Sequence, residues 1–364
     1  MKHKLIRHIA LIMAVLIASL SFAACGTSGD VSDVNSGITS VNIDSSSSTD
    51  VVTHDAFNYL TGEYNMSSDM VGVRPIAVSI NNITAAWPDY STSKPDILFE
   101  METEGGIPRY MALFADIRGI SQIGSVRSLR DQFIELVYPY DALICHIGTS
   151  IYADAVLSEL GLSTLDGDAH SDLLFIDQSR VGIYSTEHTK FTSADRIYQC
   201  IDELGIDMTA DFTSTAFNFV DEDETVTPST GTATQVNWQF SSSYDGDFRY
   251  NESTGKYEKW ECGEQQIDAS NNEPLAFDNV FLILAPIQLR AGTPLIEVDF
   301  STGGTAYYFS NGHYQLCNWT KGSGDYSSNF KFTDATTGEE IQVNTGKSYV
   351  AVIRTDFADT VSIA

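Results

Sequence analysis

Residues 97–115 read ILFEMETEGGIPRYMALFA, and this stretch decides the fold class of the first half of the chain. It contains two short apolar runs, Ile97–Met101 and Tyr110–Ala115, with turn-forming Gly and Pro residues between them. Short apolar runs that are bounded by turn residues are typical of buried β-strands. The runs Ile76–Ile80 and Ala142–Ile147 have the same character, so we predict four strands in this region.

Helical patterns lie between and after these runs. Apolar residues from Leu129 to Val137 repeat at helical spacing, and a second helix is predicted over Tyr152–Leu160, ending at Gly161. A third helix is predicted between Ser193, a suitable N-cap, and Gly205, a suitable stop. Strands and helices together predict an α/β or α+β fold for the first domain.

The second half of the chain has a different residue pattern. After Phe240 no strong helical period is present, and β-like runs alternate with turns rich in Gly, Asn, Thr and Ser. We therefore predict a mainly-β sandwich or small barrel. An acidic run at Asp221–Glu224, followed by small turn-forming residues, is typical of a linker, although a long surface loop is the alternative. The predicted domains are a mixed α/β domain at 70–220, an acidic linker at 221–235 and a β-rich domain at 236–364.

The N-terminus is typical of a secreted protein. Basic residues at Lys2, Lys4 and Arg7 precede an apolar run that is too short to span a bilayer. The sequence that follows, SFAACG, resembles a bacterial lipobox and predicts a signal peptide at 1–24 and acylation of Cys25. An ordinary cleavable signal with a chance cysteine is the alternative. Residues 25–69 are rich in Ser, Thr, Asp, Asn and Gly, and we predict a disordered, lipid-anchored tether there. The alternative, near the end of this range, is a first strand around Val51 and Val52 or over Phe57–Leu60.

The charge excludes several classes of function. The chain of 364 residues has a formal net charge of −29, and removal of residues 1–24 leaves 17 Lys and Arg against 49 Asp and Glu, a charge of −32. A surface this acidic repels phosphate backbones and anionic lipid, so we predict no nucleic-acid partner. The expected membrane contact is through acylated Cys25 alone. We predict no cofactor.

Several stretches carry a family resemblance. They are, in order, RPIAVSINN at 74–82, KPDILFE at 94–100, EGGIPRY at 104–110, IGSVRSLR at 123–130, and Tyr140 to Gly148. This order resembles the YerB-like family of bacterial lipoproteins, which are built from paired domains of unknown function. The resemblance implies an envelope lipoprotein of two domains, but it implies no reaction.

The chain also departs from that family pattern. The family usually has a His soon after the Asn pair, and here Ile83 and Thr84 follow Asn82. Where the family tends to have Pro-His-Asn, this chain has Glu187, His188 and Thr189. The resemblance therefore implies Asn82, Asp96, Glu104 and His188 as candidate site residues, without the partners that the family would place beside them.

An arginine cluster is the most informative chemical feature. Arg109, Arg118, Arg127 and Arg130 fall within 22 positions of a strongly acidic chain. Ser128 is predicted to cap the following helix through its spacing to Asp131, and two arginines beside a helix N-terminus would bind phosphate, pyrophosphate or carboxylate. The alternative is structural pairing with three acidic residues that alternate along a strand, Glu100, Glu102 and Glu104.

Other candidates complete the list. His146 lies at the predicted carboxyl end of a strand, where ligands bind in open α/β sheets. The layout of strand, Arg-containing strand and Val-Arg-Ser turn looks like that of LytR-CpsA-Psr phosphotransferases.

A weak cation site is conceivable at Asp166, Asp168, His170 and Asp172, where a solvated acidic loop is the plainer interpretation. The remaining cysteines, Cys145, Cys200, Cys262 and Cys317, leave free thiols or a disulfide between the last two open.

These observations support three hypotheses. The first is a non-enzymatic, extracytoplasmic lipoprotein that binds a cell-wall precursor, an anionic ligand or an envelope protein through an Arg/His/Glu cleft. The second is a phosphotransferase or hydrolase acting on a lipid-pyrophosphate intermediate. In that enzyme the arginines would hold phosphate, and His146 or Glu104 would be the acid/base. The third is a protein-interaction scaffold with no small-molecule site.

Overall fold

The computed structural model describes residues 54–211, 215–322 and 326–364. The predicted signal peptide, Cys25 and residues 26–53 of the predicted tether lie outside these ranges. Among the described helices, none has the length and hydropathy needed to cross a bilayer.

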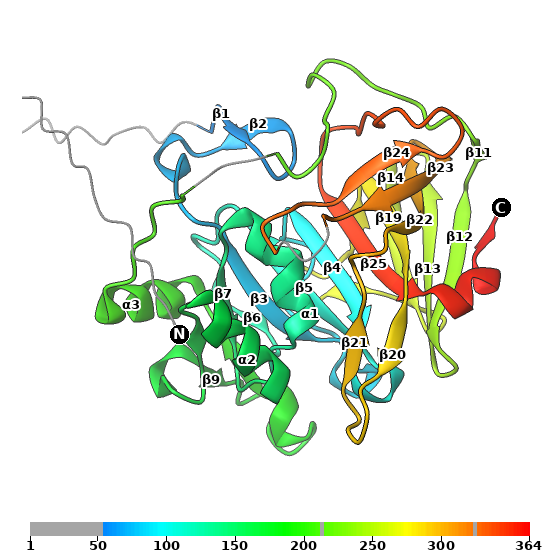
Figure 1. The fold of residues 1–364 in the computed structure, drawn as a ribbon. Helices are drawn as coiled ribbons and strands as arrows, with labels where there is room; N and C mark the ends of the chain where they lie inside the picture. Colours follow the sequence, from blue (N-terminus) through cyan, green and yellow to red (C-terminus); the bar gives the residue numbers. More distant parts are fainter. Residues whose placement is uncertain (1–53, 212–214, 323–325) are drawn as a thin grey trace, which may run out of the picture. The chain divides into compact units, whose positions relative to one another are not determined.

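A central sheet of eleven strands contains segments from both halves of the chain (Figure 1). Its neighbours, in spatial order, are β11 (Gly231–Thr232), β23 (His313–Thr320), β22 (Gly304–Ser310), β19 (Asn279–Ala285), β25 (Ser348–Arg354), β4 (Ile97–Glu102), β5 (Pro108–Phe114), β3 (Ile76–Asn81), β7 (Leu143–His146) and β8 (Leu165–Asp166), while β24 (Lys331–Asp334) pairs with β23. The strand β25 joins the halves, because it pairs in parallel with β4 on one side and with β19 on the other. The four strands predicted in the first half are β3, β4, β5 and β7.

The second sheet comes almost entirely from the second half. It has the order β15 (Glu264–Gln265), β14 (Lys256–Glu261), β13 (Tyr244–Asn251), β12 (Gln235–Ser241) and β26 (Ser362–Ile363), and β18 (Ala276–Phe277) pairs with β14. The smaller sheets are β1 (Ala56–Asn58) with β2 (Glu63–Met66), β6 (Ile123–Gly124) with β10 (Lys190–Thr192) and β9 (Phe175–Ile176), β16 (Ile267–Asp268) with β17 (Glu273–Pro274), and β20 (Ile287–Leu289) with β21 (Ile296–Val298). The mainly-β character predicted for the second half is confirmed.

Three helices belong to the first half, whose mixed α/β character is also confirmed. They are α1 (Asp131–Val137), α2 (Ile151–Leu160) and α3 (Ala194–Leu204). The side chains of Ser150 and Ser193 cap α2 and α3, and Gly161 and Gly205 end them with positive φ. Short 3-10 turns fill other connections: η1 (Ser68–Met70), η2 (Thr84–Ala86), η3 (Glu104–Gly106), η4 (Tyr138–Tyr140), η5 (Ser171–Leu173), η6 (Thr186–His188) and η7 (Thr355–Thr360).

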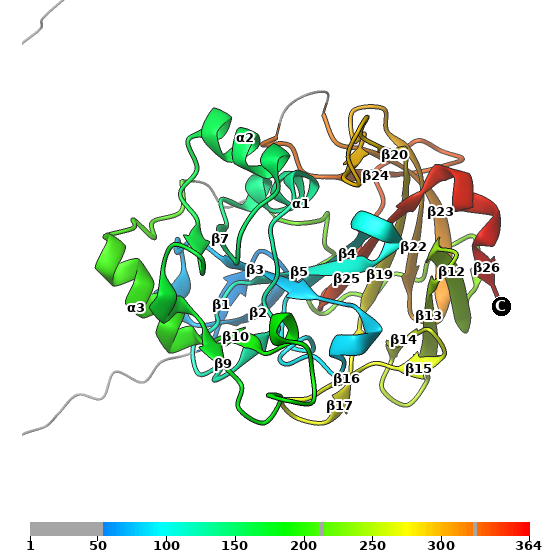
Figure 2. The ribbon, with the colours of Figure 1, turned by 90° about the horizontal axis from the view of Figure 1, so that it is seen from below.

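The central sheet is covered on both faces, which explains its near-continuous apolar strands. On one face Phe99 and Met111 pack with residues of α1 and α2, which lie together on that side (Figure 2). On the other face the alternate residues Leu98 and Tyr110 pack with α3 and with inward-facing side chains of the second sheet, such as Tyr257. Residues on opposite faces of one strand therefore belong to different cores.

Two predicted linkers contain regular structure. Strands β1 and β2 lie within the range 25–69, and Asn58 of β1 donates to Asp96 at the start of β4, 2.9 Å away. Strand β11 lies within the range 221–235 and pairs with β23. The prediction that residues 54–69 belong to a tether is wrong, because Tyr59 and Leu60 are buried in the core on the α1 side of the sheet.

Candidate functional site

Three arginines of the predicted cluster, Arg109, Arg127 and Arg130, lie at the carboxyl edge of the parallel strands of the central sheet. Arg118 does not join them: it follows the other end of β5 and pairs with Asp69 and Asp116. Arg109 is the second residue of β5 and pairs with Asn81 at the end of β3 and with Met101 near the end of β4. The segment that carries Arg127 crosses the same edge, because Arg127 N donates to Ser79 O of β3 at 2.9 Å. In open α/β sheets this edge is where ligands bind.

Two of the three arginines at this edge have carboxylate partners. Arg130 makes two hydrogen bonds to Glu104 of η3, at 2.5 and 3.1 Å, and these hold the pKa of Glu104 below its usual value although burial acts to raise it. Arg127 Nη1 lies 2.7 Å from Glu187 Oε2, and that bond lowers the pKa of Glu187. The side chain of Glu187 is 56% exposed, so its partnership is open to water. The Nε of Arg127 is buried and has no hydrogen-bond partner in the described structure.

Arg109 differs from both neighbours. Its residue is only 7% exposed, and its Nη1 donates to the carbonyl of Ser128 at 2.7 Å. Within the described ranges it makes no ion pair closer than the 4.0 Å expected of a salt bridge. Burial and the charges of Arg130 and Arg127 lower its pKa, and Glu104 and Glu187 compensate only in part. A buried guanidinium without a carboxylate in contact is an electrostatically unsatisfied group.

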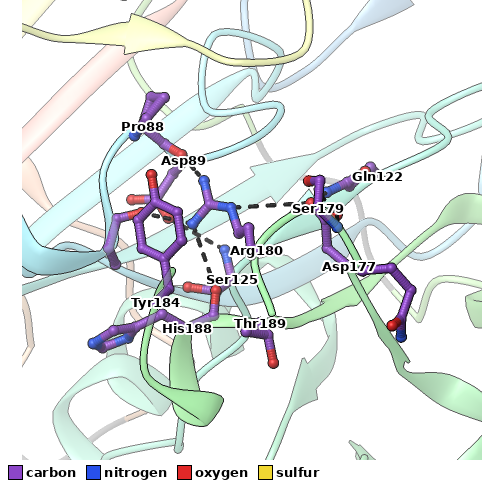
Figure 3. Close-up of polar contacts among 12 residues, drawn as sticks. Pro88, Asp89, Gln122, Ser125, Asp177, Ser179, Arg180, Tyr184, His188 and Thr189 are labelled. Atoms are coloured by element: carbon purple, nitrogen blue, oxygen red, sulfur yellow. Dashed lines mark hydrogen bonds and ion pairs between the residues drawn. The ribbon is translucent and has the colours of Figure 1, made fainter. Parts of the chain in front are cut away.

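A second polar group adjoins this cluster (Figure 3). Arg180 is buried and donates to the backbone carbonyls of Ala86, Pro88 and His188, with its guanidinium over the ring of Tyr184. The Oδ2 of Asp89 and the Oγ of Ser125 are buried near it without hydrogen-bond partners among the described residues. Burial raises the pKa of Asp89 far above its usual value.

His188 connects the two polar groups. Its Nδ1 lies 2.7 Å from the Nδ2 of Asn81, and its Nε2 lies 3.7 Å from Glu187. Because an amide nitrogen donates, Nδ1 accepts this bond, and burial lowers the pKa of His188. His188 is therefore a neutral neighbour of the arginine cluster.

Several predicted site residues do not join the arginines. His146 is 1% exposed, and its ring nitrogens bond to Gly148 O at 3.0 Å and Thr164 Oγ1 at 2.9 Å. Asp96 lies at the opposite end of β4 from Arg109 and accepts from Asn58 and from the backbone N–H of Ala115. The side chain of Asn82 points to the second sheet, where it donates to Glu261 at 3.0 Å.

The prediction that Ser128 caps the following helix is wrong. Helix α1 begins at Asp131, its N-cap residue is Arg130, and no side-chain cap bond is present there. Ser128 contributes its backbone carbonyl to Arg109 instead. The chain from Ser125 to Arg130 follows the sheet edge by backbone pairing with its neighbours, so the helix starts later than the sequence spacing indicates.

The alternating glutamates have three different partners. Only Glu104 pairs with an arginine of the predicted cluster. Glu102 lies 3.2 Å from Arg354 at the end of β25, and Glu100 contacts Lys259 of β14. The alternative of structural pairing therefore holds for Glu104 alone, because Glu100 points to the face that the second sheet covers and Glu102 pairs with Arg354.

The remaining sequence candidates have structural roles or none that the described contacts show. Asp166 accepts from the backbone N–H groups of Gly148 and Asp168 at 2.8 and 3.0 Å. No group of three or more His, Cys, Asp or Glu in the described ranges could hold a metal ion. The four described cysteines are free thiols, and all except Cys262 are buried.

The described pockets do not coincide with the arginines. One of about 480 Å³ opens beyond the carboxyl ends of β19 and β25, and its lining includes Glu297, Asp299 and Asp356. Another of about 670 Å³ lies in the second half beside Phe217 and Lys331. Arg109 is therefore distinguished by its charge and its burial, and not by a neighbouring cavity.

Sequence reasoning missed the buried ionic cluster between the two sheets. Lys259 and Glu261 on β14 are fully buried and face Glu100 of β4. The available signal was the alternation in KYEKWE at 256–261, where every second residue from Tyr257 belongs to the buried face. That pattern places Lys259 and Glu261 inside beside Tyr257.

The comparisons with known proteins agree on one family. Residues 60–207 match the family described as "Protein of unknown function (DUF3048) N-terminal domain", and residues 218–350 match its C-terminal domain. The chain is 24% identical over 285 residues to a Bacillus subtilis (strain 168) protein described as "Putative lipoprotein YerB", covering 77% of this chain and 81% of that protein. The crystal structure of YerB protein from Bacillus subtilis has the same fold, with a TM-score of 0.71 at 22% identity over 84% of this chain and 99% of that one.

Proposed function

Because the chain belongs to the YerB-like family of proteins with paired DUF3048 domains, we propose that it is a cell-envelope lipoprotein whose Arg109 cluster binds an anionic ligand. The anchor would be acyl chains on Cys25, on the extracytoplasmic side of the membrane. The ligand would carry phosphate, pyrophosphate or carboxylate, as cell-wall precursors and acidic envelope polymers do. The lipoprotein description of the Bacillus relative and the lipobox-like sequence before Cys25 support the anchor.

The burial of Arg109 without a contacting carboxylate carries the binding proposal. Three guanidinium groups share two carboxylates, so the cluster of Arg109, Arg127, Arg130, Glu104 and Glu187 has a formal charge of +1. The rest of the chain is strongly acidic. An incoming oxyanion would accept bonds from Arg109 and Arg127 and would compete with exposed Glu187 for the latter.

The geometry favours binding over phosphotransfer. His146, one proposed acid/base, is buried and has both ring nitrogens bonded, to Gly148 O and Thr164 Oγ1. Glu104, the other, is held as a carboxylate by Arg130. A general acid or base needs a proton position within reach of the reacting group, and these two side chains do not offer one.

Anion binding is tested by calorimetric titration of the full chain with inorganic pyrophosphate, and separately with a carboxylate-rich envelope polymer. Replacement R109M removes the buried charge, and we expect affinity to fall at least about tenfold, the effect of losing one charge-assisted contact. Folding should be as stable as in the parent or more so, because an unpaired buried charge disappears. The matched control is R118M, since Arg118 is a more exposed arginine already bonded to Asp69 and Asp116. Equal affinities in the parent and R109M would refute the proposal.

The anchor has its own test. Replacement C25A should move the protein from the membrane fraction to the soluble extracytoplasmic fraction, because two or more acyl chains are what give stable anchoring. Membrane retention of C25A equal to that of the parent would contradict lipidation at this residue.

A further inference from the structure

Six buried polar side chains form one closed cluster between the central sheet and the second sheet. They are, from the first half, Asn82, Glu100 and Tyr110, and from the second half Lys259, Glu261 and Tyr349. Each is at most 1% exposed. The cluster therefore joins the two family domains in a place that bulk water does not reach.

One amine and one amide share the same carboxylates. Lys259 Nζ lies 2.9 Å from Oε2 of Glu100 and 2.9 Å from Oε2 of Glu261. Asn82 Nδ2 donates to Oε1 of Glu100 at 2.5 Å and to both oxygens of Glu261 at 3.0 Å. The nitrogen of Lys259 and the amide of Asn82 thus bind the same oxygen atom of Glu261, Oε2.

The carbonyl of the same amide is also polarised. Trp87 Nε1 donates to Asn82 Oδ1 at 2.8 Å, which fixes the amide orientation and aims a donor at the oxygen that would gain charge if Cγ were attacked. The ring centroids of Tyr110 and Tyr349 lie 5.8 and 5.2 Å from Lys259 Nζ, so the two rings flank the amine. Tyr349 also donates its hydroxyl hydrogen to Glu100.

From this arrangement we propose that Lys259 and Asn82 form an intramolecular amide bond that links the two halves of the protein. Lys259 first gives a proton to Glu100. Its Nζ then forms a bond to Cγ of Asn82 while the Cγ–Nδ2 bond breaks, and the nitrogen leaves as ammonia. Glu261 accepts the second proton that Nζ releases and passes it to the departing nitrogen, and Glu100 then gives its proton to the ammonia. An ammonium and a carboxamide become a secondary amide and an ammonium ion, so atoms and charge balance without an oxidant, a reductant or a second reactant.

The protonation states suit these roles. Burial and the nearby charge of Glu100 raise the pKa of Glu261, so this carboxylate takes up a proton during the reaction more readily than an exposed one would. Burial lowers the pKa of Lys259, but the two carboxylates outweigh it, so the resting form is the ammonium. Transfer of its proton to Glu100 converts an ion pair into a neutral pair, a change that a dry site opposes less than water does.

Proximity and dryness favour the product. Glu100 and Glu261 each bind both Lys259 and Asn82 and so hold the two reacting groups close together. Groups held close and well oriented react as if at very high concentration, with effective molarities on the order of 10⁵ M or more. Exclusion of water prevents hydrolysis of the new amide. The bond would join Asn82 covalently to Lys259 of β14. The second sheet would therefore stay attached to the central sheet even while the protein unfolds.

Peptide mass spectrometry tests the proposal on the full chain purified from membranes and digested with chymotrypsin. We expect one linked species that contains Asn82 and Lys259, with a mass equal to the two peptides minus one ammonia. Two separate peptides of unchanged mass would overturn the proposal. A linked species lighter by one water would overturn it also, because Lys259 would then have reacted with a carboxyl group.

Variants separate chemistry from folding. K259R should abolish the linked species, and N82D should convert the loss from ammonia to water. E261Q should reduce the linked fraction at least about tenfold within a fixed time, since general acid catalysis contributes about 10²-fold or more. The matched control K256R changes a partly exposed lysine on the same strand and should keep the full mass loss. The parent protein alone decides the question if a variant does not fold.

Discussion

At the scale of single residues, the protein buries two cations in opposite ways. Lys259 contacts two carboxylates at 2.9 Å, whereas Arg109 contacts a carbonyl and no carboxylate in the described structure. Removing a charge from water is costly unless partners replace the lost hydration. Lys259 is therefore compensated inside the protein, and Arg109 is the residue that an external anion would stabilise.

Glu135 gives a prediction at this scale. Burial on α1 raises its pKa to about 7, although Lys321 acts in the opposite direction. The folded state thus holds a proton that the unfolded state releases, so this group's contribution to stability falls as pH rises from about 4.5 to 7. Replacement E135Q should stabilise the protein at pH 8 by on the order of 1–2 kcal/mol, since one pKa unit is worth about 1.4 kcal/mol and water screens part of it.

The measurement is the free energy of unfolding in urea at pH 5 and pH 8. At pH 5 the E135Q variant and its parent should differ little, because Glu135 is protonated in the folded protein. The control E203Q changes an exposed carboxylate on α3 and should follow the parent at both pH values. A constant difference between E135Q and its parent across this range would show that Glu135 does not titrate as described.

At the scale of elements, capping residues define where the longer helices begin. Ser150 accepts from the backbone N–H of Ala153 at 3.1 Å, and Ser193 accepts from that of Arg196 at 3.3 Å. Helix α1 has no such side-chain cap and begins where the chain leaves the sheet edge. Helix starts that local side chains set could be read from the sequence, and the start that sheet pairing sets could not.

The cap of α2 leads to a second prediction. Replacement S150A should destabilise the protein by about 1 kcal/mol, because one buried helix N–H loses its acceptor. The control is S158A in the same helix, where the exposed serine caps nothing and alanine has the higher helix propensity, so stability should be unchanged or slightly raised. Chemical denaturation of the three proteins decides the matter. Equal losses in S150A and S158A would contradict a capping role.

At the scale of the whole molecule, β25 unites the two family domains. It lies between β4 of the first half and β19 of the second, with seven register pairs to β19 and five to β4. A strand near the end of the described chain therefore completes a sheet that also contains β3 and β4 of the first half. Without β25, strands β4 and β19 would each lose a hydrogen-bonded neighbour, so neither half could complete its part of the sheet.

The position of β25 gives a third prediction. Val350 is 1% exposed and lies between Phe99 and Phe281 in the register of the sheet. Replacement V350A should cost about 2–3 kcal/mol from the lost methyl groups and the cavity. Because the strand is shared, hydrogen exchange should show equal loss of protection in β3 and in β22. The control V181A, at an exposed valine, should change neither strand. Loss of protection confined to one half would show that the halves unfold independently.

The sequence by itself determined the element types, the two contrasting halves, the acidic charge and the arginine cluster. It did so because hydrophobic periodicity, turn residues and caps act over a few neighbouring positions. The alternative of structural pairing between the arginines and Glu100, Glu102 or Glu104 holds for one pair, Arg130 and Glu104.

Only the tertiary structure decided which strands are neighbours. A period of two places Glu100 on one face of β4 and Lys259 on one face of β14, but it does not say that these faces meet. Pairing of β25 with β4 brings residues more than 240 positions apart into contact, as for Tyr349 and Glu100. Asp96 lies at the opposite end of β4 from Arg109, and Asn82 directs its side chain to Glu100 and Glu261. Partner choice depends on how the whole core packs, and no local pattern contains that information.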